Sequence, residues 1–149
     1  MSFYSANASG LGNSAAYQVS GKPYASASIQ VPELSETPHT IEFPNVTKFV
    51  TIVNTKTGTN VPLRFGFSAQ GITGSGVPAN LGPPVPGGKN NYFVLDNGES
   101  YTGEWRVSKL FLLGDEKSGN LAEASIVAGL TSIPAGDLSN NWSGSSGVG

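Results

Sequence analysis

The chain has 149 residues, the length of one ordinary domain, and its formal net charge is −2. Only 12% of its residues are charged, about half of the usual fraction, while 20 are Gly and 10 are Pro. This composition disfavours a long helical bundle. The scattered Lys and Arg residues disfavour direct binding of nucleic acid, and the absence of cysteine excludes disulfides and thiolate metal sites.

The first 24 residues are rich in Ser, Ala, Gly and Asn and predict a flexible arm without a core of its own. Its aromatic residues Phe3, Tyr4 and Tyr17 have no local core to bury them, so we expect them to make assembly contacts. Residues 1–21 lack the positive start and apolar run of a signal peptide, and no apolar stretch approaches the ~20 residues that span a bilayer. We therefore expect a soluble protein without a membrane span.

Residues 25–134 show a period of two in their apolar positions. Successive strand side chains point to opposite faces, so each such run offers one apolar face to a core. The resulting seven or eight short strands predict an all-β antiparallel sandwich. A helix over residues 120–130 is the alternative, which the clean alternation and Gly129 disfavour. The alternating runs are 25–31, 40–43, 63–67, 101–107 and 124–130, and the runs with apolar residues on both faces are 49–53 and 110–113.

Two connections stand out between the runs. Asp96-Asn97-Gly98 is a strong hairpin signal, because Asn and Gly tolerate the positive φ that tight hairpins require. Residues 69–90 have no periodicity, and a loop of this length is usually functional or disordered. Its prolines predict an ordered, projecting loop. Gly88 does not belong to a phosphate-binding loop, because Pro83 stands where that motif has its first Gly.

Candidate catalytic or metal-binding residues are sparse. The only histidine, His39, lies just ahead of a short strand and is expected at the surface. Asp96 and Glu99 flank the hairpin, where a turn-forming role is expected and a calcium site is the alternative. Glu104 and Arg106 are expected to form surface ion pairs. Since no nucleophile, base and orienting group come together, we predict no enzyme, no cofactor and no metal.

Aromatic residues suggest two further contacts. Trp142 is the one large side chain of residues 135–149, a predicted flexible tail, and is expected to anchor on a neighbouring subunit, with an exposed Trp as the alternative. Tyr92, Phe93 and Tyr101 could stack on a sugar, although strand aromatics usually belong to a core. A carbohydrate-binding module for host attachment is therefore the rival function.

Two stretches resemble the penton proteins of nucleocytoplasmic large DNA viruses, including the chlorovirus-type phycodnaviruses of algae. The first is Ile-Glu-Phe-Pro-Asn-Val-Thr-Lys-Phe-Val-Thr-Ile-Val-Asn at 41–54, followed by Leu-Arg-Phe-Gly-Phe at 63–67. The second is Val-Ser-Lys-Leu-Phe-Leu at 107–112, followed by residues 124–128 and the ending Gly-Leu-Thr-Ser-Ile-Pro at 129–134. The resemblance covers roughly residues 41–134, with a gap at the long loop.

This resemblance implies a single jelly roll that forms a homopentamer at each fivefold vertex of an icosahedral capsid. It implies contacts with major and minor capsid proteins, a location in the virion after assembly in the host cytoplasm, and no catalytic residues. We expect the long loop to form a crown or to line the fivefold axis. The loop residues expected to form this crown or axial lining are Pro78, Pro83, Pro84, Pro86 and Lys89.

Overall fold

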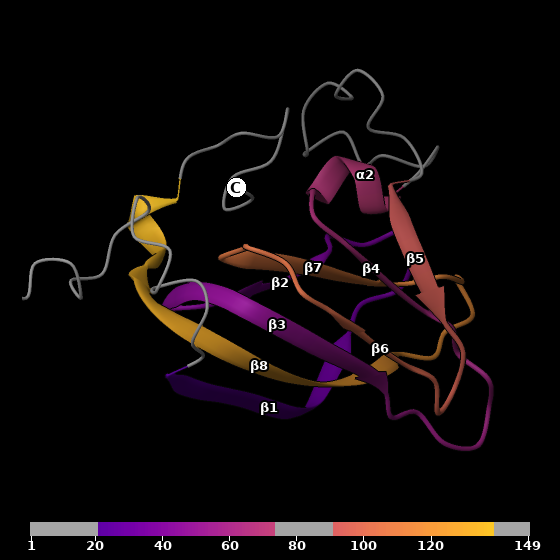
Figure 1. Cartoon of the computed structure of the whole chain (residues 1–149). Helices are drawn as coiled ribbons and strands as arrows, with labels where there is room; N and C mark the ends of the chain where they lie inside the picture. Colours follow the sequence, from indigo (N-terminus) through magenta and orange to yellow (C-terminus); the bar gives the residue numbers. More distant parts are fainter. Residues whose placement is uncertain (1–20, 74–90, 139–149) are drawn as a thin grey trace, which may run out of the picture.

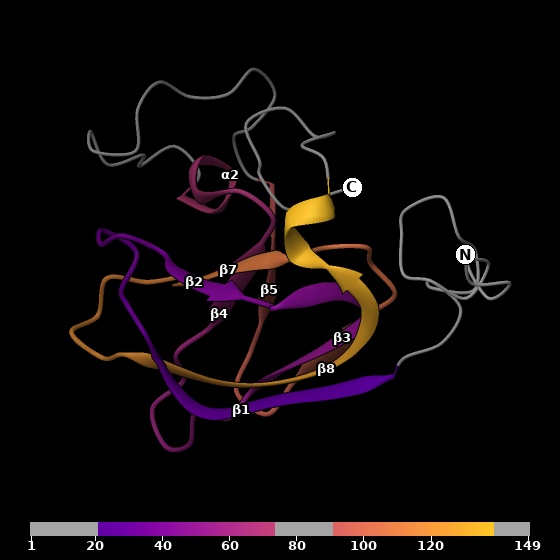
Figure 2. The same cartoon turned by 90° about the vertical axis from the view of Figure 1, so that its left-hand side faces the viewer.

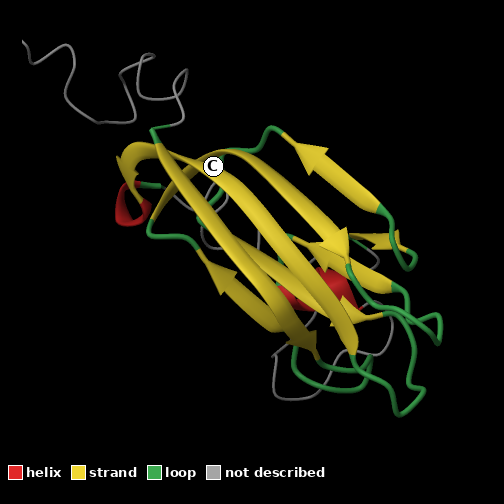
Figure 3. Ribbon diagram, turned by 90° about the horizontal axis from the view of Figure 1, so that it is seen from below, coloured by secondary structure: helices red, strands yellow, loops and turns green. Residues whose placement is uncertain are grey.

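The computed structural model describes residues 21–73 and 91–138, which form two four-stranded antiparallel sheets packed face to face (Figure 1). Figure 3 shows the two layers from below. The predicted all-β antiparallel sandwich is thus confirmed. The first sheet has the order β1 (Lys22–Val31), β8 (Ala122–Pro134), β3 (Asn45–Asn54) and β6 (Ser100–Gly103). The second has the order β2 (His39–Glu42), β7 (Lys109–Gly114), β4 (Leu63–Gly66) and β5 (Tyr92–Leu95).

The strand pairing is nested. β1 pairs with β8, β2 with β7, β3 with β6 and β4 with β5, so the first half of the chain pairs in reverse order with the second half. β3 also pairs with β8, and β4 with β7, which completes the two sheets. Residues 120–130 therefore belong mainly to a strand, as the alternation predicted, and not to a helix.

The core lies between the sheets and follows the period-two pattern. Ile52 of β3 and Ile126 of β8 are paired, fully buried, and belong to the same apolar cluster as Leu63 and Leu112 of the second sheet. Since each such side chain contributes ~1.5–3 kcal/mol when buried, the inner faces supply most of the stability. β1 begins at Lys22, ahead of the predicted start at residue 25.

The folded body extends beyond both ends of the predicted range, residues 25–134. The ring of Tyr24 meets Phe43 edge-on, with centroids 5.0 Å apart, which explains the early start of β1. At the other end, the 3-10 helix η4 (Ala135–Asp137) follows β8, and Leu138 is buried against Val46 and Ile133. The body therefore continues to residue 138, where we predicted a tail from residue 135, because Leu138 closes a small second apolar cluster.

Asn54 joins the loops at one end of the sandwich. Its side chain is buried, and Nδ2 donates to the carbonyl oxygens of Val61 and Leu95, each at 3.0 Å. Its own carbonyl accepts from the N–H of Gly98 at 2.8 Å, where Gly98 has a φ of +80°. The predicted hairpin at residues 96–98 is therefore present, and its glycine is required by the positive φ.

The segment predicted as an aperiodic loop, residues 69–90, begins with a short helix. This helix, α2 (Ala69–Thr73), packs on the outer face of β4 and β7 (Figure 2). Ile72 is fully buried there, and the Oγ of Ser68 accepts the N–H of Gly71 at 3.0 Å, as a helix N-cap does. The helix is stabilised by the burial of Ile72 against the sheet. Its five residues are too few to show helical periodicity in the sequence, so it was not predicted.

A second difference concerns residues 101–107, which alternate but do not form one strand. β6 ends at Gly103, and the chain turns before β7. Glu104 lies in this turn with its carboxylate 3.9 Å from the ammonium of Lys48, which is a surface ion pair of the kind expected. Arg106 lies in the same turn and is exposed.

The outer edge of β1 is interrupted. Its pairing with β8 shifts register between Ser26 and Ile29, and Ser28 has a φ of +54°, which is unusual for a residue other than Gly. A bulge of this kind makes an edge strand a poor template for another chain.

Arg64 is a buried cation on the outer face of the second sheet. Its Nε donates to Asp115 Oδ1 at 2.5 Å, and Nη1 donates to the carbonyl of Ile72 at 3.0 Å. Its guanidinium lies 4.0 Å from the centroid of the Tyr92 ring. One side chain therefore links β4 to α2, to β5 and to the residue after β7.

Replacement of Asp115 by Ala removes the carboxylate that compensates Arg64. The Arg64 side chain is only 9% exposed, so we expect the free energy of unfolding to fall by about 3 kcal/mol, as measured by urea denaturation. The neighbouring Glu116→Ala is the control, because this side chain is exposed and should change stability by less than about 0.5 kcal/mol. Equal effects of both substitutions would contradict this role of Arg64.

Candidate interaction surfaces

The described residues contain no cluster of side chains that could hold a metal ion. Within residues 21–73 and 91–138, no group of three or more His, Asp or Glu side chains comes together. His39 is half-buried at the start of β2. In the same part of the chain, no helix has the length and apolar character that a membrane crossing needs.

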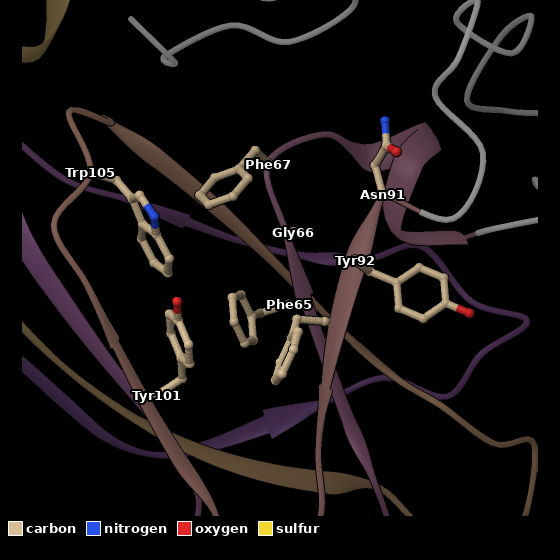
Figure 4. Close-up of a pocket in the computed structure, with 8 residues that line it drawn as sticks. Phe65, Gly66, Phe67, Asn91, Tyr92, Tyr101 and Trp105 are labelled. Carbon is tan, nitrogen blue, oxygen red and sulfur yellow. The ribbon is translucent and has the colours of Figure 1, made fainter.

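An aromatic pocket lies where the two sheets part, between the edge strands β5 and β6 (Figure 4). Its volume is about 240 Å³, which is enough for one large side chain or one small ring. Strands of both sheets and the turn after β6 contribute to it. The lining residues are Phe65, Gly66, Phe67, Asn91, Tyr92, Phe93, Tyr101 and Trp105.

The rings of the pocket form a continuous cluster around Phe65. Its centroid is 5.7 Å from that of Phe93 and 5.8 Å from that of Tyr101. Tyr101 and Trp105 lie nearly parallel, at 10° and 5.8 Å, and Phe67 meets Trp105 edge-on at 5.0 Å. Pairs at these separations contribute ~0.5–1.5 kcal/mol beyond the area they bury, so the cluster is a stable surface.

Two contacts hold Trp105 in place. A Cβ atom at Gly103 would collide with the indole ring, so the ring packs directly over the backbone of that glycine. The Oγ1 of Thr47 donates to the carbonyl oxygen of Trp105 at 2.6 Å and accepts from the N–H of Val107 at 3.2 Å. These two hydrogen bonds therefore join the turn that carries the indole to β3.

Two aromatic residues of the pocket are exposed. Phe93 is 53% and Tyr101 is 42% accessible, although we expected both in the core. That expectation was wrong because β5 and β6 are edge strands of different sheets, and no further strand of residues 21–73 and 91–138 covers them. Tyr92 turns its ring away from the cluster and toward Arg64 on the outer face (Figure 4).

The pocket has few hydrogen-bonding side chains and none that is charged. The amide of Asn91, the hydroxyl of Tyr101 and the indole N–H of Trp105 are the polar side-chain groups near the cluster. Specific ligand sites combine an apolar surface with several convergent polar groups. This pocket therefore suits an apolar or aromatic group better than a highly hydroxylated one.

A second surface is the outer face of the first sheet. One row crosses all four strands in register, from Ala25 through Val127 and Thr51 to Thr102. The hydroxyls of Thr51 and Thr102 lie 2.7 Å apart, and Val127 is 49% exposed. No residue in this row or in the two rows beside it is charged. We call this the uncharged face, and its residues are Ala25, Phe49, Thr51, Val53, Ser100, Thr102, Ser125, Val127 and Gly129.

The residues expected to make assembly contacts lie outside the described residues. This holds for Phe3, Tyr4, Tyr17 and Trp142, and for the long-loop residues Pro78, Pro83, Pro84, Pro86 and Lys89. The sequence did not single out Phe67 or the uncharged face. Both depend on which strands are neighbours, and alternation within one strand carries no such signal.

No protein-family model, no curated protein and no solved structure matches this chain. The likeness to viral penton proteins therefore rests on the two stretches within residues 41–134 that were quoted for it.

Replacement of Gly103 by Ala places a methyl group where the Trp105 indole packs. We expect the indole to leave Tyr101, with a changed near-UV circular dichroism signal and an unfolding free energy lower by about 2 kcal/mol. Gly136→Ala is the matched control, because a Cβ there meets nothing within 4 Å. An unchanged Trp105 environment in the Gly103 variant would show that the close packing is not required.

Proposed function

We propose that this protein is a structural subunit, a single jelly roll that assembles with copies of itself into a capsid vertex and catalyses no reaction. The observation that carries the proposal is the nested pairing of the eight strands. Such pairing arises when one long antiparallel hairpin is wrapped into two sheets, which is the plan of a jelly roll. Jelly rolls occur in viral capsid proteins and in lectins.

The uncharged face supports a role in assembly. Burial of a charge at an interface costs free energy unless the charge is paired, and this face buries none. A closed ring of identical subunits needs two different surfaces that meet head to tail. The uncharged face supplies one such surface.

The family resemblance supports the same proposal. The first quoted stretch supplies half of β2 and all of β3, and the second supplies most of β7 and β8. β2 lies beside β7, and β3 lies beside β8, so the two stretches meet in both sheets. On this basis we propose a homopentamer that contacts major and minor capsid proteins in a virion assembled in the host cytoplasm.

The proposal predicts the mass of the isolated protein and its response to one added charge. Native mass spectrometry of the full chain should show a pentamer. Val127→Glu should weaken association at least tenfold, or by about 1.4 kcal/mol, because it places an unpaired carboxylate in the interface. Thr57→Glu adds the same charge to an exposed loop and should leave the pentamer intact. A protein that is strictly monomeric in native mass spectrometry would contradict the proposal.

The aromatic pocket favours a second candidate, a carbohydrate-binding module, because exposed rings can stack on a sugar. A glycan array decides between the two functions. The capsid proposal predicts no glycan binding by the wild-type chain. Binding that is lost in Tyr101→Ala and kept in Thr102→Ala would favour the carbohydrate module, since these neighbours lie on opposite faces of β6.

A further inference from the structure

The turn between β5 and β6 contains the only Asn-Gly pair of the chain, Asn97-Gly98. The pair suits the turn, because the N–H of Glu99 donates to the carbonyl of Asp96 at 2.9 Å and Gly98 has a φ of +80°. The same pair is chemically labile. Glycine has no Cβ atom to hinder its backbone nitrogen, which can attack the side-chain carbonyl carbon of the preceding asparagine. Asn97 is therefore a candidate for deamidation.

Deamidation of Asn97 passes through a cyclic imide. The backbone nitrogen of Gly98 loses its proton and forms a bond to Cγ of Asn97, while the bond between Cγ and Nδ2 breaks and ammonia leaves. Water then opens the imide at one of its two carbonyl carbons. The products are aspartate and isoaspartate, and in isoaspartate the backbone runs through the side chain and is longer by one carbon. The reaction consumes only water.

Three hydrogen bonds hold the reacting groups in the folded chain. Oδ1 of Asn97 accepts from the N–H of Val61 at 3.0 Å, and Nδ2 donates to the carbonyl of Thr59 at 2.9 Å. The side-chain amide is thus fixed by the loop between β3 and β4, which lies beside the turn (Figure 1). The attacking nitrogen is held as well, because the N–H of Gly98 donates to the carbonyl of Asn54 at 2.8 Å. These bonds have to break before the imide can form.

Asn54 couples the loop to the turn. Its buried side chain donates from Nδ2 to the carbonyl of Val61 in the loop and to the carbonyl of Leu95 ahead of the turn, each at 3.0 Å. Asn97 is half-buried and Gly98 is exposed, so water already reaches the closed turn. Protection of the amide therefore comes from the hydrogen bonds, and their joint opening controls the reaction.

Neither product restores the closed arrangement. Aspartate at position 97 has no N–H for the carbonyl of Thr59 and places a carboxylate beside that oxygen. It also adds a negative charge between those of Asp96 and Glu99. Isoaspartate lengthens the backbone and displaces the N–H of Gly98 from its acceptor. A turn that has opened once and reacted therefore closes less well.

We propose that Asn97 is a latent deamidation site whose reaction is controlled by opening of this end of the sandwich. The fold keeps the residue as asparagine, and opening of the turn converts it irreversibly. This inference does not depend on the capsid proposal, because every group involved belongs to one subunit.

The rate of deamidation tests the proposal. The full chain is incubated at mildly alkaline pH, in buffer and in enough urea to unfold it, and mass spectrometry of proteolytic peptides follows the conversion of Asn97. A synthetic peptide of residues 94–101 gives the unprotected rate in both solutions. We expect the native chain to react at least tenfold more slowly than the peptide, which corresponds to an opening free energy of at least about 1.4 kcal/mol. The unfolded chain should react as fast as the peptide, and equal rates for the native chain and the peptide would overturn the proposal.

Substitution of Asn54 by Ala tests the coupling between the loop and the turn. It removes the amide that joins them and should accelerate deamidation of the folded chain at least tenfold, with folding checked by circular dichroism. The matched control is Asn120→Ala, which removes an exposed amide elsewhere and should leave the rate unchanged. A folded Asn54→Ala chain that reacts at the wild-type rate would overturn the proposal.

A second substitution keeps the proposal testable if Asn54→Ala does not fold. Asn97→Asp reproduces one product and should unfold at a lower urea concentration than the wild-type chain, because the bond to Thr59 is lost. Asn120→Asp adds the same charge to another exposed loop and should unfold like the wild type. An Asn97→Asp chain as stable as the wild type would overturn the proposal.

Discussion

Closure of the sandwich between β5 and β6 depends on Phe65. Its ring packs against Phe93 of β5, in the same sheet, and against Tyr101 of β6, in the other sheet. In the described part of the chain neither sheet has a further strand on this side, so ring packing holds the two layers together where hydrogen bonds do not. Phe65 therefore belongs to the core and also lines the pocket, so a substitution of this ring should affect both stability and the pocket.

Two buried polar side chains complement this apolar closure. Asn54 satisfies two backbone carbonyls at one end of the sandwich, and Arg64 satisfies Asp115 and the carbonyl of Ile72 on the outer face. An unpaired buried polar group costs free energy, so both networks specify one loop arrangement rather than many. A chain with 12% charged residues thus uses one of its few cations to fix α2 on the sheet.

The sequence allowed the sandwich, the strand identity of residues 120–130 and the hairpin at Gly98 to be predicted, because alternation and turn chemistry are local. It did not reveal α2, whose five residues are decided by the burial of Ile72. Nor did it place Phe93 at the surface, since an edge position depends on strand order. The end of β6 at Gly103 depends on the indole of Trp105, which follows two residues later.

The interrupted edge of β1 bears on the proposed assembly. An uncharged sheet face beside a ten-residue outer strand risks association with further copies without limit. The register shift before Ile29 denies an incoming chain a regular ladder of backbone partners. Association is thereby diverted from strand-to-strand fibre growth toward side-chain contacts, which can stop at a fixed number of copies.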